Sequence, residues 1–380
     1  MIYLDNAATS YPKPRSVYNA VAKCMRRAGG NPGRGSHALA DAAAEAVYRC
    51  REAAGEMFGC EPENVVLTFN ATHALNLAIK GFAGRGGHIL ISDIEHNSVY
   101  RPVRALCETH GYRFDIYSSC GGREDEVIED IKSKLTPDTD MIIANHASNI
   151  CSLTLPIERI GNLCRERGIT FIVDASQSAG HMKLDMRDIS ADAVCMPGHK
   201  GLYGPQGSGL LLLRGDSLPN TLIEGGSGIN SLDAFMPDIL PERLEAGTLS
   251  APCAAGLEAG IRWVNSVGVE ALHAHECELA SILSDELMNM ESISVYAPHL
   301  SGSSGVVLFG SDNMLPSALG EVLDGRGICV RCGLHCSPLA HSAVRSGENG
   351  AVRVSFGYFN TMTDVRLLTD VLYKASRGRI

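Results

Sequence analysis

The chain has 380 residues, of which 45% are hydrophobic, and a formal net charge of -10 at pH 7. Because this length exceeds what one core usually serves, we expect two domains. The acidic balance argues against a nucleic-acid-binding surface, which needs clustered basic residues, and favours small molecules or basic proteins as partners.

Membrane insertion and secretion are not expected either. No apolar run approaches the roughly 20 residues that a membrane-spanning helix needs. The first residues, MIYLDNAATS, lack the basic start and long apolar middle of a signal peptide. The thirteen cysteines are an odd number and are scattered, unlike a disulfide framework. We therefore expect a cytoplasmic protein without membrane association.

The first 250 residues alternate short apolar segments with segments of helical periodicity. Most of the apolar segments are hydrophobic throughout, as expected of strands buried on both faces. Between two of them, Val99, Val103 and Leu106 recur at helical spacing. This alternation predicts an α/β fold whose mostly parallel central sheet is flanked by helices. The predicted strands are 64–69, 88–92, 141–145, 169–174, 191–196 and 209–213.

The pattern changes after about residue 250. A long helical stretch over 253–290 precedes a mixture of short strands and helices, which predicts a smaller α+β domain. We expect residues 15–255 to form the large domain, and residues 1–14 with 256–380 to form the small one. The predicted strands are 293–297, 304–309, 328–332 and 351–356, and the predicted helices are 315–325 and 363–376.

Polar residues that follow the predicted strands are candidates for a ligand site, since ligands bind outside the carboxyl ends of strands in an open parallel sheet. Thr72 lies where a helix begins, and the free N–H groups there suit a phosphate. Lys200 lies among five glycines in PGHKGLYGPQGSG, 197–209. The other candidates at this edge are His96, Asn149, Asp174, Gln177 and His199.

Pyridoxal phosphate explains these residues as a set, although each alone has an ordinary structural explanation. Thr72 could cap a helix, and Asn149 could form a turn. Together, however, Lys200 can form a Schiff base with the cofactor while Asp174 keeps its pyridine nitrogen protonated. Neither G-x-G-x-x-G at a strand–helix junction nor G-x-x-x-x-G-K-[ST] occurs, so dinucleotides and nucleoside triphosphates lose support.

Ten segments distributed over essentially the whole chain carry a family resemblance. They are YLDNAAT (3–9), NPGRGSH (31–37), NATHALN (70–76), EHNS (95–98), SN (148–149), VDASQSAGH (173–181), GHKGLYGPQGSG (198–209), EAGT (245–248), RCGLHC (331–336) and VRVSFGYFNT (352–361). With these segments the chain resembles the class V aminotransferases, pyridoxal-phosphate enzymes of fold type I. Within that family it is similar to the cysteine desulfurases and selenocysteine lyases.

The resemblance implies a role for each residue of the predicted site. Lys200, Cys336 and His96 would be the catalytic residues, with His96 stacked on the cofactor ring. Thr248 would reach the cofactor phosphate from a neighbouring subunit, which implies a homodimer. The remaining cofactor contacts would come from Thr72, His73, Asn149, Asp174, Gln177 and His199. Substrate contacts would come from Asn149, Arg331 and Arg353.

The segment CVRCGLHCSPLAH, 329–341, carries the second half of the implied chemistry. By resemblance, the thiolate of Cys336 takes sulfur from L-cysteine, L-alanine leaves, and the persulfide passes to an acceptor protein. The planar guanidinium of Arg353 suits a substrate carboxylate. The short segment is similar to the ordered cysteine loop of enzymes that work with a dedicated sulfur acceptor.

Other functions remain open at this point. A selenocysteine lyase would use nearly the same residues, whereas a class V aminotransferase has no need of Cys336. The spacing of Cys329 and Cys332 also suits a zinc site with Cys336 and His341. Against a metal, the alternation over 328–332 places Cys329 and Cys332 on opposite faces of a strand. Pro197, where many relatives have a hydroxyl residue, cannot donate a hydrogen bond to the phosphate.

Overall fold

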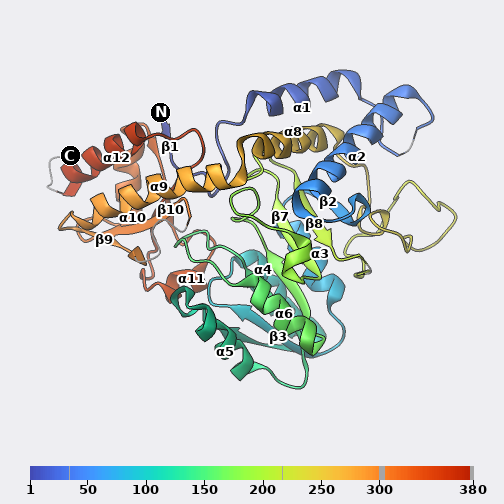
Figure 1. Ribbon diagram of the computed structural model, residues 1–380, viewed down its shortest axis with the longest axis horizontal. Coiled ribbons are helices and arrows are strands. Elements are labelled where there is room, and N and C mark those ends of the chain that lie inside the picture. Colours follow the sequence, from blue (N-terminus) through green and yellow to red (C-terminus); the bar gives the residue numbers. More distant parts are fainter. Residues whose placement is uncertain (34, 216, 299–303, 377–380) are drawn as a thin grey trace.

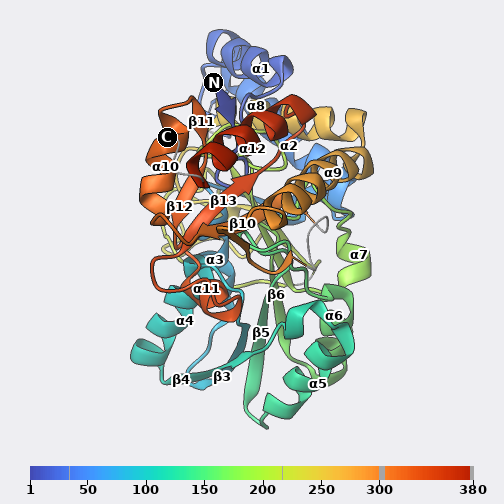
Figure 2. The same ribbon diagram turned by 90° about the vertical axis from the view of Figure 1, so that its left-hand side faces the viewer.

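The computed structural model of the chain describes residues 1–33, 35–215, 217–298 and 304–376. Within these residues the strands form three sheets, with helices packed around them (Figures 1 and 2). The strands are β1 Ile2–Tyr3, β2 Val65–Thr68, β3 Gly87–Ser92, β4 Tyr112–Tyr117, β5 Thr139–Asn145, β6 Thr170–Asp174, β7 Ala193–Pro197, β8 Gly209–Leu213, β9 Ile293–Val295, β10 Val306–Ser311, β11 Ile328–Cys329, β12 Arg331–Gly333 and β13 Ala351–Ser355. The helices are α1 Arg15–Arg27, α2 Ala38–Phe58, α3 Ala71–Phe82, α4 Asn97–His110, α5 Glu124–Lys134, α6 Ile157–Arg167, α7 Met186–Ile189, α8 Ala251–Val267, α9 Val269–Met288, α10 Pro316–Asp324, α11 Pro338–Ala343 and α12 Met362–Ser376.

The large sheet has seven strands in the order β2-β8-β7-β6-β5-β3-β4. From β7 to β4 all neighbouring strands are parallel, whereas β8 runs antiparallel to both of its neighbours. The predicted α/β fold with a mostly parallel sheet is therefore confirmed. Its six predicted strands are all present, and β4 is an additional strand at the edge.

Apolar cores cover both faces of this sheet, which explains why its strands are hydrophobic throughout. In β5, Met141 and Ile143 face a core that α3 and α4 complete, while Ile142 and Ala144 face a core built with α2, α5 and α6. Burial on both faces leaves the strand ends as the places where polar side chains can meet a ligand.

The second sheet is antiparallel, in the order β12-β13-β10-β9, and packs against α9, α10 and α12. Strand β1 pairs in parallel with β11, so the first residues lie beside the C-terminal part of the chain. Figure 2 shows α11 between this second sheet and α4.

Two predictions for the C-terminal part were wrong in detail. The single strand expected over 328–332 is divided between β11 and β12, which belong to different sheets. The single helical stretch expected over 253–290 is interrupted at Gly268, whose φ of 96° lies in the left-handed region and separates α8 from α9.

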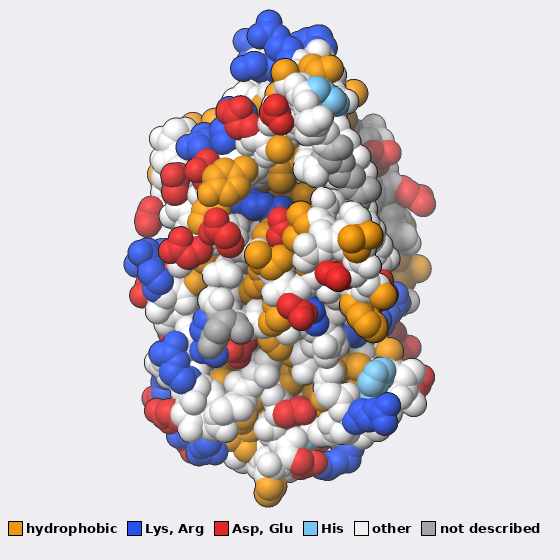
Figure 3. Space-filling model, turned by 90° about the vertical axis from the view of Figure 1, so that its right-hand side faces the viewer, with side chains coloured by type: hydrophobic (Ala, Val, Ile, Leu, Met, Phe, Trp, Pro, Cys, Tyr) orange, Lys and Arg blue, Asp and Glu red, His pale blue; other side chains and the backbone are white. Residues whose placement is uncertain are grey.

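One face of the molecule carries charged side chains of both signs. Over the face shown in Figure 3, acidic and basic side chains are interspersed with hydrophobic ones. None of the helices in the described residues has the length and apolar character needed to cross a bilayer.

Candidate active site

A cavity of about 250 Å³ lies at the carboxyl ends of the large sheet's strands. Its walls come from the N-terminal segment, the strand ends, and the segment that joins β12 to α11. Ten of the twelve residues predicted for the site line it: Thr72, His96, Asn149, Asp174, Gln177, His199, Lys200, Arg331, Cys336 and Arg353.

The other two predicted residues, His73 and Thr248, do not line this cavity. The ring of His73 stacks on Phe69, with 4.7 Å between the ring centroids. Thr248 lines a separate small pocket beside Phe69, where its hydroxyl accepts a hydrogen bond of 3.3 Å from Asn31. Thr248 therefore does not enter the cavity of its own chain.

Asp174 and Lys200 come from the ends of two paired strands, β6 and β7. Asp174 is only 2% exposed, and its Oδ1 accepts a 2.9 Å hydrogen bond from the N–H of Ser176. Burial raises the pKa of Asp174, and burial lowers the pKa of Lys200 to about 8 although the nearby Asp174 carboxylate opposes that shift. The cavity thus holds an amine that is partly neutral near physiological pH.

Glycine is required beside the lysine by close backbone packing. A Cβ on Gly201 would lie 2.3 Å from the carbonyl oxygen of Ala179 and 2.7 Å from Nε2 of His181. The structure thus shows that this glycine lets the Lys200 turn pack against a neighbouring segment.

One end of the cavity is suited to an anion. Helix α3 begins there, with Asn70 as its N-cap and Thr72 in its first turn. Nδ1 of His199 is buried without a hydrogen-bond partner among the described residues. The free N–H groups of a helix N-terminus attract negative charge, and His199 adds an unpartnered imidazole nitrogen to the same cavity, so these groups fit the phosphate of pyridoxal phosphate. Pro197 lines the same cavity, and hydroxyl groups are supplied there by Ser98 and Ser176.

His96 presents a neutral ring to the cavity. It is the N-cap of α4, and its Nδ1 accepts a hydrogen bond of 3.1 Å from the N–H of Ser98. Burial, with Lys200 and Arg331 nearby, lowers the pKa of His96 to about 4. Since Nδ1 accepts, the single proton is on Nε2.

Arg353 is held by two groups, and one of its three nitrogens has no hydrogen-bond partner in the described part of the chain. Its guanidinium donates to Oδ1 of Asp5 at 2.6 Å and to the carbonyl oxygen of Asn149 at 3.0 Å. The side chain is 1% exposed, and its Nε is buried without a partner among the described residues. An unsatisfied buried donor is costly, so this nitrogen is suited to a bound carboxylate.

Cys336 lies in a loop with an unusual backbone. His335 and Cys336 have φ values of 52° and 58°, and the carbonyl of Cys336 accepts a 2.8 Å hydrogen bond from the N–H of Asn97. The exposed thiol lies 3.9 Å from a terminal nitrogen of Arg331. Asn149 holds the loop on the other side, donating to the carbonyl of His335 at 3.1 Å and accepting from Ser337 at 2.8 Å.

Sequence reasoning missed two residues that shape this site. Asp5, the partner of Arg353, lies 348 positions from it along the chain, so no local pattern could have paired them. Ser98 bonds to His96 and to Thr72, whose hydroxyl lies 2.7 Å away. The sequence signal for Ser98 was its position two residues after His96, where its N–H can donate to the capping side chain.

The metal alternative gains no support from the geometry. Cys332 packs into the apolar core of the second sheet, whereas Cys336 lines the cavity. Across the described part of the chain, no three His, Cys, Asp or Glu side chains are arranged to hold a metal ion.

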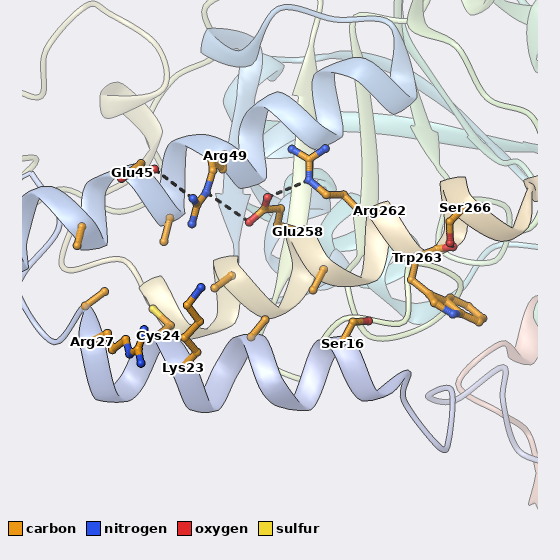
Figure 4. Close-up of a pocket in the computed structure, with 16 residues that line it drawn as sticks. Ser16, Lys23, Cys24, Arg27, Glu45, Arg49, Glu258, Arg262, Trp263 and Ser266 are labelled. Atoms are coloured by element: carbon orange, nitrogen blue, oxygen red, sulfur yellow. Dashed lines mark hydrogen bonds and ion pairs between the residues drawn. The ribbon is translucent and has the colours of Figure 1, made fainter.

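A second cavity, of about 650 Å³, lies between α1, α2 and α8 (Figure 4). In its wall Arg49 pairs with Glu45 and Glu258, Arg262 pairs with Glu258, and much of the remaining wall is alanine. None of the twelve predicted site residues lines it, so the candidate active site is the cavity around Lys200.

Comparisons with known proteins agree with this site. The family described as Aminotransferase class-V matches residues 2–368. A probable cysteine desulfurase of Methanothermobacter thermautotrophicus is 30% identical, over 98% of this chain and 94% of that protein. Another, of Streptomyces coelicolor, is 32% identical over 98% of this chain and 91% of the relative.

A solved structure gives the same result for the fold. The apo structure of a cysteine desulfurase from Thermococcus onnurineus NA1 superposes with a TM-score of 0.91 at 30% identity, covering 99% of this chain and 95% of that one. The chain therefore belongs to the class-V aminotransferase family of pyridoxal-phosphate enzymes, and within it to the cysteine desulfurases.

Proposed function

We propose that the chain converts L-cysteine to L-alanine and retains the sulfur on Cys336 as a persulfide, which an acceptor protein then takes. The observation that carries the proposal is that Cys336 lines the same cavity as Lys200, Asp174 and Arg353. An aminotransferase requires the amine, the carboxylate and the arginine, but it has no use for a thiol at that position.

The cavity residues would hold the cofactor at three places. Thr72 and His199, with His73 close by and Thr248 from a second copy, would bind the phosphate. Asp174 would lie against the ring nitrogen, Gln177 against the ring hydroxyl, and His96 against the ring face. When bound, pyridoxal phosphate supplies an electron sink for the electron pairs released at the substrate carbons.

Residues of the chain bind the substrate, transfer its protons and take its sulfur. Nε of Arg353 binds the substrate carboxylate, and Asp5 and Asn149 keep the guanidinium in place. Lys200, with a pKa of about 8, takes and returns a proton at the substrate Cα. The thiolate of Cys336 bonds to the substrate sulfur as the C–S bond breaks, and a proton delivered to that carbon completes alanine.

A route to the acceptor is supported by a second opening beside Cys336. This cysteine also lines an outer groove of about 400 Å³ between α3 and α4, to which Lys80 and Arg101 contribute positive charge. A persulfide on Cys336 would therefore be reached from outside without passing Lys200.

We also propose a homodimer and a cytoplasmic location. The dimer is supported by the position of Thr248, which lies outside the cavity of its own chain and is available to a second copy. A reducing compartment is supported by the cysteines, since all thirteen are free thiols.

The test is incubation of purified, cofactor-loaded protein with L-cysteine, with L-selenocysteine, and with an amino donor plus a keto acid. We expect stoichiometric alanine and sulfide in the presence of a thiol acceptor, and a mass increase of one sulfur atom on Cys336. Turnover of selenocysteine alone would instead indicate a selenocysteine lyase, and keto-acid amination would indicate an aminotransferase.

A further inference from the structure

Behind Cys336, two buried histidines form a hydrogen-bonded chain that the proposed chemistry does not use. Nε2 of His335 lies 3.1 Å from the carbonyl oxygen of Arg331, and Nδ1 of His335 lies 3.0 Å from Nε2 of His341. Nδ1 of His341 in turn contacts the hydroxyl of Ser346. The two histidines are 4% and 2% exposed, and their rings are stacked.

Burial keeps both rings neutral, because it lowers the pKa of His335 to about 3 and that of His341 to about 4. A neutral ring carries one proton, and the carbonyl of Arg331 can only accept, so His335 carries its proton on Nε2 and its Nδ1 accepts. His341 then donates from Nε2, which leaves its Nδ1 to accept from Ser346.

These hydrogen bonds hold the side chain of His335 at a point where the backbone is strained. His335 and Cys336 both have positive φ, a conformation that residues with a Cβ adopt only when their surroundings impose it. The carbonyls of both residues are already held, by Asn149 and by Asn97. The imidazole of His335 is the third group that holds the loop, and its Nδ1 has a hydrogen-bond partner only while His341 donates to it.

We propose that His341 and Ser346 are positioning residues, which act through His335 to keep the thiol of Cys336 facing the cavity beside Arg331. The inference rests on the proposed function for what Cys336 does, but the hydrogen-bond chain itself is independent of that function. It identifies α11, which carries His341, as the support of the reactive loop.

The test compares two substitutions of His341 in the cofactor-loaded enzyme. His341→Leu removes the donor to His335, whereas His341→Gln offers an amide N–H close to the position of the imidazole Nε2. For His341→Leu we expect kcat for alanine formation to fall about 10- to 100-fold, the effect of misplacing a reacting group by about 1 Å. KM for cysteine should change less than about twofold, and His341→Gln should recover most of kcat.

A second measurement does not depend on turnover. Hydrogen exchange followed by mass spectrometry should show that His341→Leu loses amide protection in peptides covering residues 334–341. The matched control is His88→Leu. His88 is another buried histidine, at the start of β3, and its ring is hydrogen-bonded to Thr139 at 2.8 Å. This control variant should lose stability without changing exchange in the Cys336 loop. If His341→Leu does not fold, the milder variant Ser346→Ala replaces it. We expect Ser346→Ala to lower kcat about threefold.

Three results would overturn the inference: a kcat for His341→Leu within twofold of the parent, an equal loss in His341→Gln, or an equal loss in His88→Leu. If the parent enzyme forms no alanine from cysteine, the proposed function fails, and the hydrogen-exchange comparison alone decides whether His341 positions the loop.

Discussion

Substitution of Glu245 by glutamine would perturb a buried ion pair that joins the large sheet to the segment carrying Thr248. Arg51 of α2 donates to the two carboxylate oxygens of Glu245 at 2.8 and 2.6 Å, and the N–H of Leu67 in β2 donates to one of them at 2.6 Å. Arg51 and Glu245 are 6% and 7% exposed. The pair is therefore almost entirely removed from solvent screening.

The expected cost follows from this burial. Removing one charge of a buried pair lowers the free energy of unfolding by about 3–5 kcal/mol, because the other charge stays desolvated without a partner. Glutamine keeps the shape of Glu245 and can still accept from Leu67, so we expect a loss near the lower limit, about 3 kcal/mol. A double replacement, Arg51→Met with Glu245→Met, should recover most of it, since no charge is then left buried.

Urea unfolding followed by circular dichroism, at fixed protein and cofactor concentration, measures this loss. The matched control is Glu126→Gln on α5, which breaks an exposed pair with Arg123, the N-cap of that helix, and should leave the unfolding curve unchanged. If Glu245→Gln unfolds within about 1 kcal/mol of the parent, the guanidinium of Arg51 has found water or another partner, and the reasoning from burial is wrong.

Four further predictions concern the site. Lys200→Ala should lose the visible absorption of the bound cofactor, and borohydride reduction of the parent should attach the cofactor to Lys200 and to no other lysine in a peptide map. Asp174→Asn should retain cofactor but lose about 10³-fold in kcat, equal to about 4 kcal/mol of activation free energy, and turnover within a few-fold of the parent would exclude the proposed role. Cys336→Ser should bind cysteine and release no alanine, whereas Cys332→Ser should stay active; mass spectrometry for the persulfide distinguishes the two. His341 has a folded pKa of about 4 against an ordinary value of 6.5, so the unfolded chain takes up this proton first and stability falls as pH drops from 6.5 to 4. His341→Gln should reduce that slope in urea titrations by up to about 1.4 kcal/mol per pH unit, and an unchanged slope would mean that the imidazole titrates normally in the folded protein.

The central part of the fold was predictable because its strands are buried on both faces. Strand β5 has a continuous apolar run over residues 141–144, which is typical of a short strand buried between two helical segments. The edge strand β4, YRFDIY, was not predicted because Arg113 and Asp115 face solvent, so its apolar residues only alternate. The division at Gly268 also escaped prediction, because hydrophobic periodicity is similar on both sides of one glycine.

The site was predictable only as far as it depends on strand ends. Asp174 ends strand β6, and His96 and Lys200 come within four residues of the ends of β3 and β7, so parallel strands bring them to one edge. The partner of Arg353 was not predictable, since Asp5 reaches it only because the N-terminal segment pairs with the C-terminal part of the chain. The relation of Thr248 to the cavity depends on a second copy of the chain and stays a prediction.

The ion pair between Asp5 and Arg353 has a consequence for the biosynthesis of the protein. The two residues are 348 positions apart, so at the usual rate of translation Arg353 leaves the ribosome on the order of tens of seconds after Asp5. During that time strand β1 also lacks its partner β11, and Leu4 and Asn6 lack the carbonyl groups of Cys329 and Ser355 to which they donate. The large sheet can fold on the nascent chain, but the substrate arginine acquires its counter-charge only after β13 has been made. Ribosome-bound chains that end before β13 should therefore contain the seven-stranded sheet and an N-terminal segment that proteases still cut.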